Sequence, residues 1–117
     1  FWAEPELLQP IYEILHKKYG KRINLTFSLA KCLEVMDANT NKGSAVQIIL
    51  NEKGLKTTEA IAFGDAMNDV EMLRLVGKGI LMANAQKMLC AALPNAEKTS
   101  SSKENGVAKI LNQLLQE

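Results

Sequence analysis

Two carboxylates and a carboxamide follow an apolar segment near the middle of this 117-residue chain. The apolar run over residues 60–63 ends at Gly64. The polar side chains that come next are Asp65, Asn68 and Asp69. In a parallel α/β sheet, ligands bind beyond the carboxyl ends of the strands, and a glycine there lets the backbone turn sharply. Because Mg²⁺ takes carboxylate oxygens together with water and phosphate, this stretch predicts a site for a divalent cation beside a phosphate group.

Two of these side chains also have a plain structural interpretation. Asp69 suits the first turn of a helix, where the helix dipole favours an acid, and Asn68 suits the residue that caps that helix. For this pair alone, both interpretations stay open. The complete stretch, with its strand end and its glycine, favours the cation site.

Strands and helices alternate along the sequence from residue 43 onward. Short apolar runs indicate buried strands, and apolar side chains at helical spacing indicate the helices between them. This alternation favours a parallel sheet with right-handed crossovers. The predicted strands cover residues 60–63, 79–82 and 96–99, and the predicted helices cover residues 44–52, 69–75, 86–93 and 107–115.

The first part of the chain has a different pattern. A helix is predicted over residues 4–19, because apolar side chains recur there at helical spacing and Gly20 suits its end. Residues 23–28 and 31–37 each alternate between apolar and polar side chains, which indicates an antiparallel pair with a solvated face. The turn-rich residues 37–42 then form the best boundary, so we predict domains over 1–37 and 38–117.

The composition is that of an ordinary globular protein. Hydrophobic residues make up 47% of the chain and charged residues 23%, and the formal net charge is +1. We therefore expect no binding to nucleic acid or to an anionic membrane surface. No apolar run approaches the roughly 20 residues that span a bilayer.

The cysteines and the start of the chain give weaker indications. Cys32 and Cys90 have neither metal-binding nor redox spacing, so we expect free thiols in a reducing, cytoplasmic setting. No signal peptide is visible at the start. The chain starts at Phe1, in mid-pattern, and we expect it to be part of a longer protein.

Four segments together resemble a known family. Residues 64–69 (Gly-Asp-Ala-Met-Asn-Asp) resemble the fourth signature motif of the haloacid dehalogenase superfamily, and more narrowly of its Cof-type sugar-phosphatase branch. Lys42 and Gly43 resemble the Lys-Gly of the third motif. Residues 82–85 resemble a Met-Gly-Asn-Ala turn with alanine in the second position, and residues 105–108 resemble an Asp-Gly-Val-Ala helix start with asparagine in the first. The likeness covers about residues 31–117.

The resemblance implies a role for each matching residue. Asp65 would ligate Mg²⁺, and Asp69 would support that ligation directly or through water. Lys42 would neutralise the transferring phosphoryl group and orient the nucleophile. Asn68 would donate or accept a hydrogen bond to substrate or phosphate, whereas Asn84 would order its own loop.

The resemblance also implies a fold and an activity. The fold would be a portion of a parallel, three-layer, Rossmann-like α/β core, preceded by the tail of an α+β cap domain that encloses the substrate. The activity would be Mg²⁺-dependent hydrolysis of a small phosphorylated metabolite, such as a sugar phosphate, through an aspartyl-phosphate intermediate. The sequence gives no indication of oligomeric state.

One motif of that family does not occur in this chain. The attacking aspartate of the family belongs to an Asp-x-Asp motif, and no Asp-x-Asp is found in these 117 residues. A covalent route needs its nucleophile. We therefore expect that the nucleophile lies before Phe1 and that these residues alone are inactive.

Three other interpretations stay open at this point. The phosphorylation domain of a cation-pumping ATPase has a similar motif, but the residues that follow Asp69 differ from the pump pattern. A receiver-type signalling domain also has an aspartate at a strand end, but its lysine follows that aspartate, whereas Lys42 precedes Asp65. The chain could also be an inactive homologue that binds phosphorylated ligands.

Overall fold

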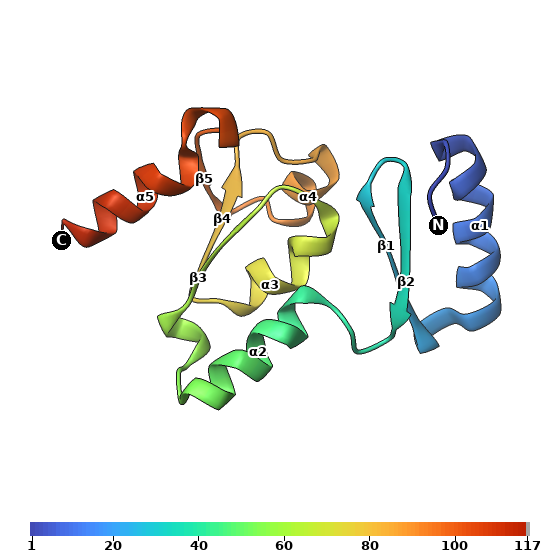
Figure 1. Ribbon diagram of the computed structural model, residues 1–117, viewed down its shortest axis with the longest axis horizontal. Coiled ribbons are helices and arrows are strands. Elements are labelled where there is room, and N and C mark those ends of the chain that lie inside the picture. Colours follow the sequence, from blue (N-terminus) through green and yellow to red (C-terminus); the bar gives the residue numbers. More distant parts are fainter. Residues whose placement is uncertain (117) are drawn as a thin grey trace.

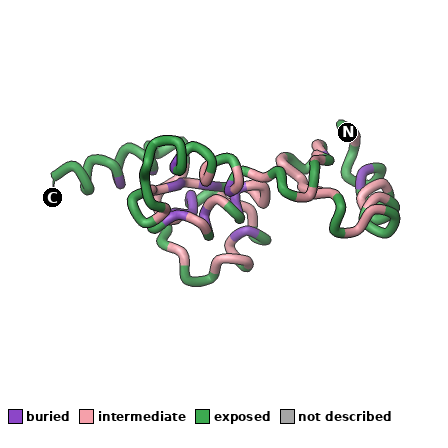
Figure 2. Tube along the Cα trace, turned by 90° about the horizontal axis from the view of Figure 1, so that it is seen from below, coloured by how far each residue is buried: buried purple, intermediate pink, exposed green. Residues whose placement is uncertain are grey.

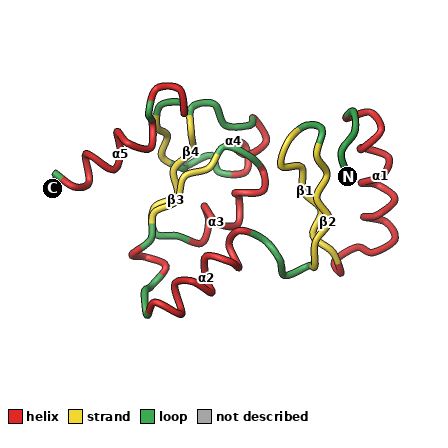
Figure 3. Tube along the Cα trace, in the orientation of Figure 1, coloured by secondary structure: helices red, strands yellow, loops and turns green. Residues whose placement is uncertain are grey.

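The computed structural model describes residues 1–116, and Figure 1 shows two groups of elements joined by a loop. The first group, named here the hairpin unit, contains helix α1 (Pro5–Tyr19) and strands β1 (Ile23–Leu29) and β2 (Cys32–Asp37). The second group, named here the sheet unit, follows the loop over residues 38–41 and holds all the remaining elements. In Figure 3, the chain passes from the hairpin unit to the sheet unit through this loop.

The hairpin unit is an antiparallel strand pair with one helix on it. β1 and β2 pair with Thr26 opposite Glu34 and Phe27 opposite Leu33. α1 packs on the face that carries Phe27, whose ring stacks on Tyr12 with centroids 5.9 Å apart. Because neighbouring side chains of a strand point to opposite faces, the more polar face, with Thr26 and Glu34, is directed away from α1.

The sheet unit contains a parallel sheet of three strands in the order β3-β4-β5. Its strands are β3 (Ile61–Gly64), β4 (Lys78–Met82) and β5 (Glu97–Thr99). Its helices are α2 (Lys42–Lys53), α3 (Val70–Leu75), α4 (Lys87–Ala92) and α5 (Gly106–Leu115). Four single 3₁₀ turns complete the chain, namely η1 (Gly20–Arg22), η2 (Thr57–Glu59), η3 (Met67–Asp69) and η4 (Ser102–Glu104).

Apolar burial is concentrated in the sheet unit. α3 packs on β3 and β4, and α2 packs on α3 from outside. Figure 2 shows most of the buried positions along the strands and the adjoining helices of this unit. The buried cluster consists of Ala62, Val70, Leu73, Val76, Leu81 and Leu89. At about 25 cal/mol per Å² of apolar surface removed from water, burial of this kind is the main term that holds the strands and helices together.

The α/β fold class and the parallel sheet predicted from the sequence are confirmed, and each predicted element is present with shifted ends. α2 begins at Lys42, two residues earlier than predicted, because Asn41 caps it: the Asn41 carboxamide accepts from the Ser44 backbone at 2.8 Å, and the Ser44 hydroxyl accepts from the Asn41 backbone at 3.1 Å. α3 begins one residue later than predicted, because residues 67–69 form the turn η3.

The structure also bears on the expectations about membrane-spanning helices and about the two cysteines. No helix within residues 1–116 combines the length and the apolar character that a membrane crossing requires. Cys32 and Cys90 are both free thiols, as predicted.

Candidate active site

Gly64 ends β3 and leaves room for a carboxylate against the end of the strand. A Cβ atom added to Gly64 would lie 2.6 Å from the Asp69 Cβ and 2.9 Å from the Asp69 Oδ2. Both distances are well inside van der Waals contact. The glycine therefore lets the Asp69 carboxylate fold back from η3 onto the carboxyl end of the sheet.

Asp69 is the one buried charged residue in the described part of the chain, with 4% of its surface exposed. Its Oδ2 accepts hydrogen bonds from the backbone N–H groups of Asp65, at 2.9 Å, and Ala66, at 3.2 Å. Its Oδ1 accepts from the Lys42 ammonium in an ion pair. A buried carboxylate is tolerated when such partners replace its lost hydration. Each oxygen of Asp69 is thus already engaged by a donor of the chain itself.

Lys42 reaches this carboxylate from the first turn of α2. A cation at that end of a helix is opposed by the helix dipole, and the Asp69 charge offsets this. Gly43 lets the start of α2 lie close to the start of α3, since a Cβ on Gly43 would be 2.9 Å from the backbone carbonyl carbon of Glu71. The Lys42 side chain remains 49% exposed. Because an ammonium has three N–H donors, Lys42 can bind an anion while it is paired with Asp69.

Asp65 is exposed and is held by residues from the neighbouring strand end. The Asn84 side chain donates through its Nδ2 to the Asp65 Oδ2 at 3.2 Å, and its Oδ1 accepts from the Ser102 backbone N–H at 3.0 Å. The Gln86 backbone donates to the Asp65 carbonyl at 2.8 Å, and the Gln86 side chain accepts from the Met67 backbone at 2.9 Å. The loops after β3 and β4 are thus tied together around Asp65.

Ser102 belongs to a turn that is ordered by its own acid. Glu104 accepts hydrogen bonds from the Ser101 hydroxyl at 2.6 Å and from the Ser101 backbone at 3.2 Å. These bonds, the hydroxyl first, hold the pKa of Glu104 below its ordinary value. The turn therefore presents the Ser102 N–H to Asn84 in a fixed position.

Asp65 and Asp69 form an acidic corner at the carboxyl end of β3, and its donor set can be compared with the ligands of a divalent cation. Within residues 1–116, no three His, Cys, Asp or Glu side chains gather in an arrangement that could hold a metal. Asp65 does present one carboxylate oxygen that accepts no hydrogen bond from the described residues. Mg²⁺ takes one or two protein carboxylates and keeps several waters. The Asp65 carboxylate fits one such ligand. The other ligands of the ion would have to be water, phosphate or groups other than the described His, Cys, Asp and Glu side chains.

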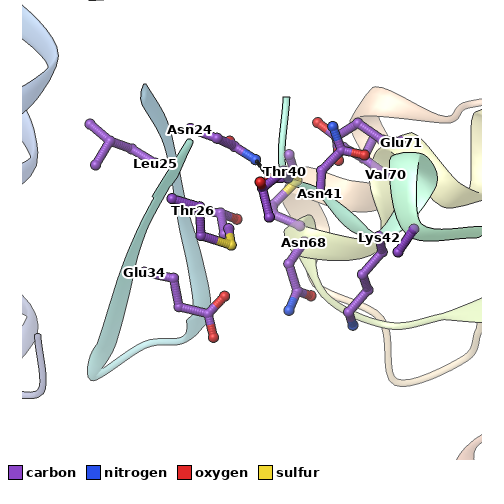
Figure 4. Close-up of a pocket in the computed structure, with 13 residues that line it drawn as sticks. Asn24, Leu25, Thr26, Glu34, Thr40, Asn41, Lys42, Asn68, Val70 and Glu71 are labelled. Carbon is purple, nitrogen blue, oxygen red and sulfur yellow. Dashed lines mark hydrogen bonds between the residues drawn. The ribbon is translucent and has the colours of Figure 1, made fainter. Parts of the chain in front are cut away.

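A cavity of about 270 Å³ lies between the hairpin unit and the sheet unit, and Figure 4 shows the side chains around it. Lys42 and Asn68 line it, whereas Asp65 and Asp69 do not. The Asn68 Oδ1 is buried and has no hydrogen-bond partner in the described chain. Such an atom is costly to leave unpaired, and it belongs to a residue that lines the cavity. The lining residues from β1 and β2 are Asn24, Leu25, Thr26, Glu34 and Met36.

The hairpin contribution to this cavity corrects the expectation of a solvated face. Thr26 and Glu34 are only partly exposed, because the sheet unit covers the polar face of the hairpin. The alternation in the sequence places them on one face but carries no information about what that face meets. Gln86 was also not anticipated, since a glutamine at the start of a helix has no distinctive signal.

The chain matches the model of one protein family over residues 1–111, and the description of that family is haloacid dehalogenase-like hydrolase. Among curated relatives, the HMP-PP phosphatase of Citrobacter koseri is 44% identical over 101 residues, which are 86% of this chain and 37% of that protein. The chain spans well under half the length of the curated relatives that it matches.

Solved structures give the same fold. The protein SMU.1108c of Streptococcus mutans UA159 superposes with a TM-score of 0.82 at 31% identity, covering 97% of this chain and 42% of that one. The sugar phosphatase BT4131, of subclass IIB of the same superfamily, superposes with a TM-score of 0.79 over 92% of this chain and 40% of that one. At 23% identity, this second likeness shows the fold alone.

Proposed function

Because this chain belongs to the haloacid dehalogenase-like hydrolase family, we propose that it supplies the phosphate- and metal-binding end of a Mg²⁺-dependent phosphatase that acts on small phosphorylated metabolites. The observation that carries the proposal is the ion pair between Lys42 and the buried Asp69 at the carboxyl end of the parallel sheet. It fixes a half-exposed cation at one wall of a cavity, and the same Asp69 carboxylate accepts a hydrogen bond from the backbone of the exposed Asp65.

Lys42 binds the transferring phosphoryl group in this proposal. Its two ammonium protons that are not directed at Asp69 donate to phosphoryl oxygens, where negative charge is concentrated in the transition state. Asp69 is a positioning residue, because its oxygens hold Lys42 on one side and the N–H groups of Asp65 and Ala66 on the other. Because both oxygens of Asp69 already accept from donors of the chain, Asp69 supports the metal through water in this proposal rather than as a direct ligand.

Asp65 supplies a carboxylate oxygen to Mg²⁺, and Asn84 keeps that carboxylate in one orientation. When bound, the ion would neutralise phosphate charge that would otherwise repel this acidic corner. Asn68 offers its buried and unpartnered Oδ1 to a donor of the substrate. The attacking aspartate is one that these 117 residues do not contain, so the covalent step belongs to the whole protein.

The relatives support a small substrate, since the Citrobacter koseri protein is named for a phosphorylated compound, HMP-PP. The cavity of about 270 Å³ is slightly below the usual range of about 300–1,000 Å³ for ligand sites, which favours a small substrate. The family match over residues 1–111 includes the hairpin unit. The alternative of a receiver-type domain does not account for that unit.

The proposal is tested by phosphate release from a panel of phosphorylated metabolites, using the full-length protein that carries this chain, with Mg²⁺ or with a chelator. We expect Mg²⁺-dependent release from at least one sugar phosphate or related ester. A protein that releases phosphate equally well with the chelator, or that releases none from the panel and from p-nitrophenyl phosphate, would overturn it.

A further inference from the structure

Glu34 stands out among the cavity residues because nothing in the described chain neutralises it. It is half-buried on β2, and it forms no hydrogen bond or ion pair with any of residues 1–116. A partly buried carboxylate loses hydration, and it regains that free energy only from a donor or a cation. No donor or cation of the described cavity wall forms such a bond with Glu34.

The position of Glu34 is set by the hairpin register. It lies opposite Thr26, so the two side chains share the face that meets the sheet unit. Figure 4 shows the Glu34 carboxylate, the Asn68 carboxamide and the Lys42 ammonium extending to the same side of the cavity, with Asn68 between the other two. A molecule held at Lys42 by its phosphate would therefore extend past Asn68 toward Glu34.

The charges around the cavity make the Glu34 wall acidic. The Lys42 charge is already paired with Asp69. The other charged lining residues are Glu34 and Glu71, and in Figure 4 the Glu71 side chain is directed away from the Lys42 end. The Asn24 amide directs one of its two N–H groups to the Thr40 carbonyl at 2.8 Å, and it forms no hydrogen bond with Glu34 in the described chain.

We propose that Glu34 is a specificity-determining residue, which selects phosphate esters whose leaving group carries an amine or hydroxyl donor and rejects those that carry a carboxylate. This inference rests on the proposed phosphatase function. A donor on the leaving group would hydrogen bond to the Glu34 carboxylate, whereas a second anion there would be repelled in a partly desolvated space. Lys42 does not discriminate between esters with a donor on the leaving group and esters with a carboxylate there, because both carry the same phosphate.

The test compares leaving groups of similar size in the full-length protein. The probes are glucosamine 6-phosphate, glucose 6-phosphate and 6-phosphogluconate, and the quantity is kcat/KM for each with Mg²⁺. In Glu34→Gln, we expect the ratio of glucosamine 6-phosphate to 6-phosphogluconate to fall about tenfold from its wild-type value, since a charged hydrogen bond and a charge repulsion are both lost. Glu34→Ala should shift the ratio the same way and should also lower the value for glucose 6-phosphate, because no acceptor remains.

Glu52→Gln is the matched control, since Glu52 is an exposed acid on α2 that does not line the cavity. It should leave the kcat/KM values of all three probes, and therefore their ratio, unchanged. A ratio that moves less than about threefold in both Glu34 variants, or that moves equally in the control, would overturn the inference. If the wild-type protein hydrolyses p-nitrophenyl phosphate with Mg²⁺ while the Glu34 variants show no such shift, only the Glu34 inference fails. If it hydrolyses neither p-nitrophenyl phosphate nor any probe, both fail.

Discussion

The replacement Asp69→Asn separates the structural role of Asp69 from the metal role proposed for Asp65. The Asp69 carboxylate accepts three hydrogen bonds, from Lys42 and from the backbone of Asp65 and Ala66. A carboxamide has one oxygen to accept with, and its NH₂ group is a donor. If the oxygen keeps the two backbone N–H groups, the NH₂ faces the Lys42 ammonium. The opposite orientation leaves two amide donors without an acceptor.

The expected cost follows from the less unfavourable of these arrangements. Loss of a hydrogen bond to a charged group costs about 1.5–3 kcal/mol. The half-exposed Lys42 can recover some hydration, which lowers this cost, while the donor facing it raises the cost. We therefore expect Asp69→Asn to lower the free energy of unfolding by about 2 kcal/mol. It should also slow phosphate release, because Lys42 is no longer held.

The assay is urea unfolding together with steady-state phosphate release, both on the full-length protein. Asp65→Asn is the control, because that carboxylate is exposed and accepts one hydrogen bond of 3.2 Å. We expect Asp65→Asn to change the free energy of unfolding by less than about 0.5 kcal/mol while abolishing most of the activity. Equal destabilisation by the two variants would refute the reasoning about Asp69.

Two further replacements test the packing and the charge of the same corner. Gly64→Ala should lower the free energy of unfolding by about 1–3 kcal/mol and reduce activity, because its Cβ would displace the Asp69 carboxylate. Gly54→Ala, at a φ of +65° with open space around it, should lose about 1 kcal/mol and keep its activity, and a loss of activity there would count against the Gly64 explanation. Lys42→Ala should lower kcat about a hundredfold or more with a smaller change in KM, since charge stabilisation at the transition state is removed. An unchanged kcat would contradict that role.

Most of the fold could be predicted from the sequence because its signals are local. Hydrophobic periodicity and the positions of Gly and Pro depend on neighbours in the chain, so all the regular helices and strands were predicted. Their ends were less accurate, because caps decide them: the reciprocal bonds of Asn41 and Ser44 start α2 at Lys42. The turn η3 was not predicted, since Asn68 and Asp69 suit a cap and a first helical turn equally well.

The site could be predicted only in part, because much of it depends on contacts between distant segments. The motif at residues 64–69 predicted an acidic corner at a strand end, and the structure has one. The contact of Lys42 with Asp69 joins residues 27 positions apart and was not predicted, because the family resemblance placed both residues in one site but gave them separate roles. Glu34 was not identified, because its alternation in β2 is the same whether its face meets water or the sheet unit.

The Mg²⁺ dependence of phosphate release in Asp65→Ala tests the central claim most directly. The full-length protein would be assayed at saturating p-nitrophenyl phosphate over a range of Mg²⁺ concentrations. We expect saturable activation of the wild-type protein and a loss of at least about a hundredfold in the variant, at every Mg²⁺ concentration that can be reached. A variant that keeps the wild-type rate and the wild-type Mg²⁺ dependence would contradict the assignment of this corner as the metal and phosphate end of the site.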